Sequence, residues 1–139
     1  MSGERFEMRP IGVVESPLRE LHEAPRQGDE GAPEAWLHLE ARVRAGLDGL
    51  APGDEIVVLT WLDRASRDVL RVHPRGDASR AEQGVFTTRS PDRPNPIGVH
   101  RVTVSAIEAP TRLRVTALEA IDGTPILDLK AVMEESRGE

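Results

Sequence analysis

The sequence of 139 residues contains no cysteine. This absence excludes disulfide bonds, thiolate metal sites, iron–sulfur clusters and a cysteine nucleophile. No apolar run approaches ~18 residues, so we expect no membrane-spanning helix. The opening residues, MSGERFEMRP, lack the apolar core of a signal peptide. We therefore expect a cytoplasmic protein, and the length predicts a single domain covering residues 1–139.

Several catalytic signatures are also missing. The four histidines show no HxH or HExxH spacing, and no pair of carboxylates is placed to complete a metal triad, so we expect no bound metal. Without a G-x-S-x-G elbow, serine hydrolase chemistry has no support. Because P-loop and G-x-G-x-x-G motifs are absent too, a nucleotide-like cofactor would not be held in the manner of a Rossmann fold.

Lysine is nearly absent, since Lys130 is the only lysine among 18 basic residues and all the others are arginine. A GC-rich genome is the simpler explanation of this bias, and the planar contacts that arginine makes at a specific site are the functional one. The 24 acidic residues give a formal net charge of −6. Such a chain does not favour indiscriminate phosphate binding, so any contact with RNA would be local.

The apolar residues that are present follow the period of β-strands. Residues 36–43 (WLHLEARV) alternate between apolar and polar, which predicts a half-buried strand, and residues 55–62 (EIVVLTWL) are typical of a buried strand. Further strand-like segments lie at residues 68–73, 84–88, 100–107, 112–121 and 125–132. Helix candidates are residues 41–50, if the first strand ends early, and residues 134–138. This pattern predicts an all-β sandwich or barrel of about six or seven strands with at most two short helices.

Residues 84–100 (GVFTTRSPDRPNPIGVH) form the most informative segment. Prolines at 91, 94 and 96 fix φ and remove three N–H donors, so neither a helix nor a central strand can pass through. The stiff, extended loop that remains presents Arg89, Ser90, Asp92, Arg93 and Asn95, and His100 follows it. Two arginines and an amide on a rigid loop are suited to a small ligand. A proline-rich turn with solvated charges explains the same composition equally well.

Two other segments carry candidate residues. Residues 120–128 (AIDGTPILD) contain an Asp-Gly pair typical of a tight turn between strands, and Asp122 projects beside this turn. The long loop of residues 21–34 is rich in glycine, proline and charge, and loops of that length tend to be functional or mobile. Within it, Arg26 and Gln27 follow a proline, a pattern that by itself indicates no chemistry.

Four stretches occur in an informative order. They are PIGVVESPLRE followed by PRQ (residues 10–27), GLDGL with an apolar strand ending in WLDR (46–64), GVFTTRSPDRPNPIGVHRV (84–102) and LEAIDGTPILDLK (118–130). Together they resemble the TsaA-like or TrmO-like family, S-adenosylmethionine-dependent tRNA methyltransferases built on a β-barrel. The run TRSPDRPNPIG is highly specific, and the stretches cover nearly the whole chain. We therefore expect one TsaA-like (TrmO-like) domain over residues 1–139.

The resemblance implies a small β-barrel that forms a homodimer and binds S-adenosyl-L-methionine in a cleft near the dimer interface. The implied reaction is methylation of N6 of a threonylcarbamoyl-modified adenosine beside the anticodon of tRNA. Methyl transfer from a sulfonium requires mainly alignment, which can contribute ~7–11 kcal/mol. The exocyclic amine must also lose a proton, and Asp122 is the candidate catalytic acceptor.

The family pattern also implies which residues contact each ligand. The cofactor contacts are Arg26, Gln27, Asp63, Arg64, Arg89 and the predicted strand formed by Leu118, Glu119, Ala120 and Ile121. Arg89 is expected to pair with the methionine carboxylate. Arg93 and Asn95 are expected at the mouth of the cleft against the tRNA, with His100 as a third substrate-binding residue. Asp63 stands where the family usually has a histidine.

Two alternatives stay open. The same barrel could methylate a small molecule or another RNA, or it could bind S-adenosylmethionine without catalysis. A basic stripe leading from the cleft would favour RNA, whereas a closed apolar pocket would favour a small molecule.

Overall fold

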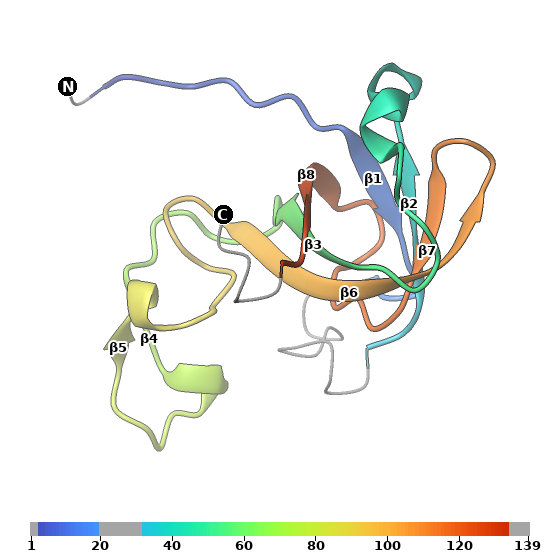
Figure 1. Cartoon of the computed structure of the whole chain (residues 1–139). Coiled ribbons are helices and arrows are strands. Elements are labelled where there is room, and N and C mark those ends of the chain that lie inside the picture. Colours follow the sequence, from blue (N-terminus) through green and yellow to red (C-terminus); the bar gives the residue numbers. More distant parts are fainter. Residues whose placement is uncertain (1–2, 20–31, 134–139) are drawn as a thin grey trace.

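The computed structural model describes residues 3–19 and 32–133, and a closed barrel of six antiparallel strands dominates this part of the chain. In spatial order the barrel strands are β1 (Gly12–Glu15), β2 (Ala35–Leu39), β7 (Arg112–Val115), β6 (Ile97–Glu108), β3 (Glu55–Trp61) and β8 (Pro125–Ala131). Pairing of β1 with β8, with Gly12 opposite Ile126, closes the ring. Figure 1 shows the barrel on the right, with the N-terminal residues extending away from it. The expected all-β fold is confirmed.

Alternation places one side of each strand inside the barrel. In β2, Ala35, Leu37 and Leu39 are buried, while His38 lies on the outer side with its Nε2 2.6 Å from Glu15 Oε1 of β1. The same core contains Val14, Ile56, Val58, Val102, Val104, Leu113, Val115, Leu118, Ala120 and Ile126. Burial of apolar surface stabilises a fold by about 25 cal/mol per Å², so these inward positions hold the barrel together.

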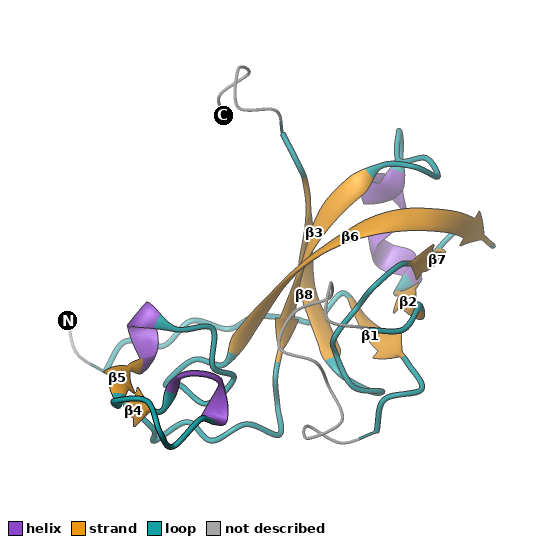
Figure 2. Ribbon diagram, turned by 90° about the horizontal axis from the view of Figure 1, so that it is seen from below, coloured by secondary structure: helices purple, strands orange, loops and turns teal. Residues whose placement is uncertain are grey.

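A small lobe lies beyond one end of the barrel (Figures 1 and 2). It consists of the two-stranded sheet of β4 (Arg71–Val72) and β5 (Gln83–Gly84) with the 3-10 helices η4 (Pro74–Gly76) and η5 (Val85–Thr87). Val85 is 1% exposed and donates its N–H to Leu70 O at 2.9 Å, which anchors η5 beside β4. In the chain the lobe lies between β3 and β6, so it is attached at the barrel end where Trp61 of β3 pairs with Ile97 of β6.

Three predicted elements differ from the structure. The strand expected over residues 36–43 ends at Leu39, and the 3-10 helix η3 (Ala41–Leu47) follows, which matches the alternative of an early strand end. Residues 84–88 form no continuous strand, because the Thr87 hydroxyl donates to Gly84 O at 2.8 Å and stabilises the tight turn of η5. Residues 118–121 form no strand, because Ala117 has a φ of 56°, which ends the extended backbone after β7.

The helices of the described ranges are all short. They are η3, η4 and η5, so this part of the chain has three short helices where at most two were expected. Residues 134–138, the other predicted helix, lie outside the described residues. Within the described ranges no helix has the length and apolar character needed to cross a membrane.

Candidate functional site

A cleft of about 550 Å³ lies between the end of the barrel and the small lobe. The barrel side is formed by the segment after β3, the first residues of β6 and residues 119–121, and the lobe contributes β4, η4, β5 and η5. The lining mixes charged, hydroxyl and apolar side chains, among them Asp63, Arg89, Glu119, Thr87, Thr88, Val72 and Ile121. This volume and this mixture are typical of a small-molecule site.

A buried polar group forms the floor of the cleft. His100 on β6 is 4% exposed, its Nε2 lies 2.8 Å from Thr60 Oγ1 on β3, and its Nδ1 lies 2.7 Å from Glu119 Oε1. A carboxylate only accepts hydrogen bonds, so the Nδ1 proton points to Glu119, and the Thr60 hydroxyl donates to Nε2 when the ring is neutral. The group Thr60–His100–Glu119 thus joins three segments of the chain at the cleft. His100 lines the cleft although it is buried, and its contact with substrate stays a prediction.

The proline loop (residues 89–96) forms a wall of the cleft and is fixed to the turn after β3. Asp92 Oδ1 accepts the backbone N–H of Ser66 at 2.8 Å, and the N–H of Arg93 donates to Ser66 O at 3.0 Å. Arg67 Nε donates to Pro94 O at 2.8 Å. These bonds join residues more than 25 positions apart and give the loop the stiffness that its prolines predict.

Arg93 and Asn95 are both hydrogen-bonded within the chain. Arg93 lines the cleft, but its Nη2 donates to Val85 O and, at 2.9 Å, to Thr88 O, so the guanidinium holds η5 in place. Asn95 does not line the cleft, and its Oδ1 accepts from Arg67 Nη2 at 3.0 Å. Both side chains therefore help to hold the loop and the lobe, and their contact with tRNA stays a prediction.

Most residues expected to contact a cofactor do line the cleft: Asp63, Arg64, Arg89, Glu119, Ala120 and Ile121. Arg89 reaches β6, where its Nη2 donates to Val99 O at 2.8 Å. Leu118 is fully buried behind the cleft, with its N–H bonded to Pro33 O at 3.1 Å. Arg26 and Gln27 lie outside the described residues. The fold thus gathers charges of both signs from three separate segments.

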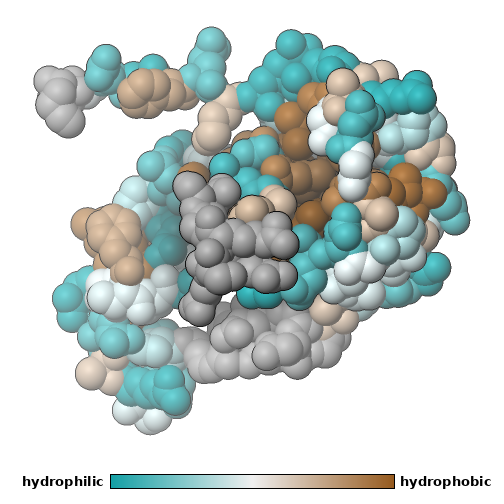
Figure 3. Space-filling model, in the orientation of Figure 1, coloured by the Kyte–Doolittle hydropathy of each residue, from teal (hydrophilic) through white to brown (hydrophobic). Residues whose placement is uncertain are grey.

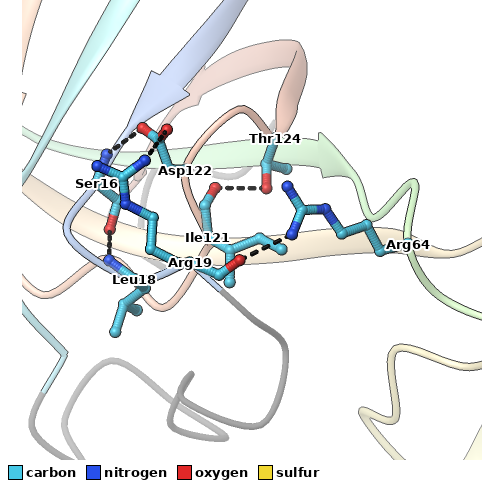
Figure 4. A network of polar contacts seen from close by, with 7 residues as sticks. All are labelled: Ser16, Leu18, Arg19, Arg64, Ile121, Asp122 and Thr124. Carbon is cyan, nitrogen blue, oxygen red and sulfur yellow. Dashed lines mark hydrogen bonds and ion pairs between the residues drawn. The ribbon is translucent and has the colours of Figure 1, made fainter.

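Asp122, the predicted proton acceptor, does not line the cleft. Its Oδ1 accepts the backbone N–H of Ser16 at 3.0 Å, and its Oδ2 accepts from Arg19 Nη1 at 3.2 Å (Figure 4). Arg64, which lines the cleft, donates to Arg19 O at 2.8 Å. Asp122 therefore ties the turn before β8 to the segment after β1, and its role as proton acceptor stays a prediction.

Sequence reasoning missed several polar residues of the site. A hint of Thr60 is present in the sequence, because a polar residue inside the apolar run EIVVLTWL is unusual. In the structure Thr60 is fully buried. Thr87, Thr88 and His73 line the cleft without any spacing motif, because the lobe brings them there through tertiary structure. Among the residues that the structure describes, no three histidine, aspartate or glutamate side chains are grouped as a metal ion requires.

The protein is a closed antiparallel barrel with a cleft of ligand size at one end. The proline loop, held by hydrogen bonds, forms one side of this cleft. These features are those of a class of small barrel proteins that bind a small ligand. Residues 13–136 match the family model described as the tRNA-methyltransferase O N-terminal domain. The match covers most of the chain, and the chain belongs to this family. The resemblance found in the motifs is confirmed.

Relatives of known sequence and structure agree with this placement. A protein named "Probable S-adenosyl-L-methionine-binding protein" from Methanothermobacter thermautotrophicus is 42% identical over 135 residues, which covers 97% of this chain and 96% of that protein. An "S-adenosyl-L-methionine-binding protein" from Archaeoglobus fulgidus is 44% identical over 128 residues, 92% of this chain and 90% of that protein. The crystal structure of TrmO from Pseudomonas aeruginosa aligns with a TM-score of 0.75 and 28% identity over 98% of this chain. This chain spans only 60% of the length of that structure.

Proposed function

We propose that this chain binds S-adenosyl-L-methionine in the cleft and is a methyltransferase that acts on tRNA, at N6 of a modified adenosine beside the anticodon. The supporting observation is the proline loop, which is held in place by hydrogen bonds. Its sequence TRSPDRPNPIG carries the family resemblance, and its residues line the cleft. Membership of the family supports the methyl-transfer chemistry. Because tRNA is the proposed acceptor, we place the protein in the cytoplasm.

The residues of the cleft fit S-adenosylmethionine in size and in chemistry. Its 550 Å³ falls within the ~300–1,000 Å³ of small-molecule sites. Arg64 and Arg89 would hold the methionine carboxylate, Asp63 the ribose hydroxyls or the ammonium group, and the backbone of residues 119–121 the adenine edge. The cofactor would supply a methyl group activated by a positively charged sulfur.

The chain itself then contributes mainly positioning. Holding an amine in line for attack can lower the barrier by ~7–11 kcal/mol, provided that the surrounding groups are already fixed. The bonds from Asp92, Arg67 and Arg93 fix the loop that walls the cleft. The amine nitrogen that receives the methyl group would give up one proton to a carboxylate or to water.

Two carboxylates are candidates for that proton. Asp122 is the predicted acceptor, and Glu119 lines the cleft with its Oε1 on His100. Replacement of the acceptor by its amide (Asp122→Asn or Glu119→Gln) should lower kcat by about 10²- to 10⁴-fold with little change in cofactor affinity. Loss of affinity instead of kcat would make the residue a binding group.

The proposed function is tested by incubating the protein with bulk tRNA and S-adenosylmethionine carrying a labelled methyl group, followed by nucleoside analysis. Label in an N6-modified adenosine supports the proposal. Label that enters no nucleoside, although calorimetry shows cofactor binding, contradicts the tRNA assignment.

A second candidate function is cofactor binding without methyl transfer. It is favoured by the names of the archaeal relatives, which state only S-adenosyl-L-methionine binding. The same labelled reaction distinguishes the two functions. In separate reactions, a small-molecule extract from cells tests for a small acceptor, and another RNA in place of tRNA tests for a different RNA acceptor. Binding with no labelled product in any of these reactions supports the second candidate.

We also propose that the protein forms a homodimer, as the resemblance implies. The two tryptophans are partly covered within the chain, because Arg112 stacks 4.0 Å from the Trp36 ring centroid and Arg67 5.1 Å from that of Trp61, so neither alone indicates the contact surface. Light scattering at micromolar concentration is the measurement. A monomeric mass overturns this proposal.

A further inference from the structure

The small lobe exposes an aromatic side chain next in sequence to a residue that lines the cleft. Phe86, in η5, is 80% exposed, although the residues on both sides are engaged: Val85 is buried and Thr87 lines the cleft. Figure 3 shows an apolar surface patch on this lobe, at the left. Among the described residues of the lobe, Leu70 and Phe86 are the exposed large apolar side chains.

The backbone under Phe86 is rigidly held. Arg93 donates to the carbonyls of Val85 and Thr88, and the Thr88 N–H returns to Val85 O at 3.0 Å. On the other side of the turn, the Thr87 hydroxyl donates a hydrogen bond to Gly84 O at 2.8 Å. A turn fixed by this many bonds presents its aromatic side chain from an ordered backbone, which lowers the entropic cost of binding a ligand.

We propose that Phe86 is a stacking platform for an unstacked base of the RNA acceptor, next to the base that enters the cleft. This inference rests on the proposed function and deepens it, since it assigns to Phe86 a contact with a second base of the looped RNA. Such RNA is recognised in part by stacking of splayed bases on aromatic side chains, and the stacking contact itself needs no positive charge. A chain of net charge −6 is suited to that mode of binding.

A second protein copy would need a larger apolar surface than this patch alone offers. A stable protein interface buries about 800 Å² on each partner around an apolar centre. The side chains next to Phe86 and Leu70 are polar and exposed, including Arg71, Glu82 and Gln83. A single ring beside a cleft matches the size of one base. Arg93, which holds η5 by its guanidinium, is on this view a positioning residue for Phe86.

The test compares Phe86→Ala, Phe86→Trp and the matched control Leu70→Ala, an exposed apolar residue of the same lobe. The probe is a fluorescent single-stranded RNA of the tRNA anticodon loop, with binding measured by anisotropy at fixed salt. Phe86→Ala should weaken RNA binding about 5- to 150-fold, while Phe86→Trp retains most of it and Leu70→Ala is close to wild type. Cofactor affinity by calorimetry and mass by light scattering should be unchanged.

The outcomes distinguish the stacking platform from the proposed reaction on tRNA. Equal RNA affinity of Phe86→Ala and wild type overturns the stacking platform, and so does a fall in mass of this variant, which would make Phe86 an interface residue. Wild-type protein that binds no RNA overturns both the platform and the tRNA proposal. RNA binding that depends on Phe86 without methyl transfer supports the platform and overturns only the proposed reaction.

Discussion

Gly98 is the residue at which a single methyl group should damage the site. It lies on β6 opposite Thr60 of β3, directly over the buried group beneath the cleft. A Cβ added at Gly98 would stand 2.4 Å from Thr60 Oγ1 and 2.6 Å from His100 Nε2, distances that real side chains do not tolerate. Gly98→Ala therefore forces one of these two groups to move.

Neither group can move freely. Thr60 is fully buried, and His100 is 4% exposed and held by Glu119 through Nδ1. Overpacking of a filled core costs about 1–3 kcal/mol. Separation of Thr60 from His100 leaves buried polar atoms without a partner, which costs about 1–3 kcal/mol more. We expect Gly98→Ala to lower the free energy of unfolding by about 2–4 kcal/mol, allowing for partial relaxation.

The assay is urea unfolding followed by circular dichroism, with Gly46→Ala as the control. Gly46 lies in η3, and no heavy atom would lie within 4 Å of a Cβ there. Its replacement should leave stability unchanged or raise it by about 0.4–1 kcal/mol. If Gly98→Ala costs no more than Gly46→Ala, the packing of Thr60 against His100 is not as described. Calorimetry on the same variants should show weaker cofactor binding for Gly98→Ala alone.

Three further predictions concern charge. Arg89→Ala should weaken binding of S-adenosylmethionine by calorimetry, whereas Arg44→Ala, an exposed arginine of η3 outside the cleft, should not; equal affinities would remove Arg89 from the cofactor site. Hydrogen bonds from the hydroxyl and N–H of Ser79 hold the pKa of Asp77 below its ordinary value of 3.8, so Ser79→Ala should raise it in an NMR titration. Because the folded pKa is lowered, the stability from this turn is present above about pH 4 and lost as pH falls through the folded pKa; an unchanged titration would contradict the assigned cause. The affinity for tRNA should fall only shallowly with salt, with roughly two or three phosphates neutralised, and the slope of a strong binder with six to ten contacts would refute this.

The period of the apolar residues predicted most of the barrel and failed where single residues override it. Residues 55–62 and 125–132 correspond closely to β3 and β8. Alternate residues of β3 are buried, whereas only Ile126 of β8 is buried. The strand predicted over residues 112–121 is cut short by the left-handed φ of Ala117, a conformation that nothing in alanine itself predicts. Threonine hydroxyls that bond to the backbone turned residues 85–87 into η5 against their β propensity.

The candidate site was predicted through motifs rather than through geometry. Asp63, Arg64 and Arg89 line the cleft as the resemblance implied, because each lies in a stretch that carries the family pattern. The bond between Asp92 and Ser66 joins residues 26 positions apart, and no local pattern indicates it. For the same reason, the inward turn of Arg93 could not be predicted from a loop whose prolines fix only the backbone.

The excess of arginine acquires a structural explanation from these contacts. Proline-rich segments have few N–H donors, so their carbonyl groups lack partners, and a guanidinium with five fixed donors can supply several at once. Arg42 donates to Pro10 O at 2.8 Å, Arg67 to Pro94 O at 2.8 Å, and Arg93 to two carbonyls of the lobe. Lysine, with a compact ammonium group, cannot replace such a forked contact. Guanidinium groups engaged in this way are less available to phosphates, so the arginine content overstates the cationic surface. On the proposed function, we therefore expect shape and stacking to add to a few charged contacts in the recognition of RNA.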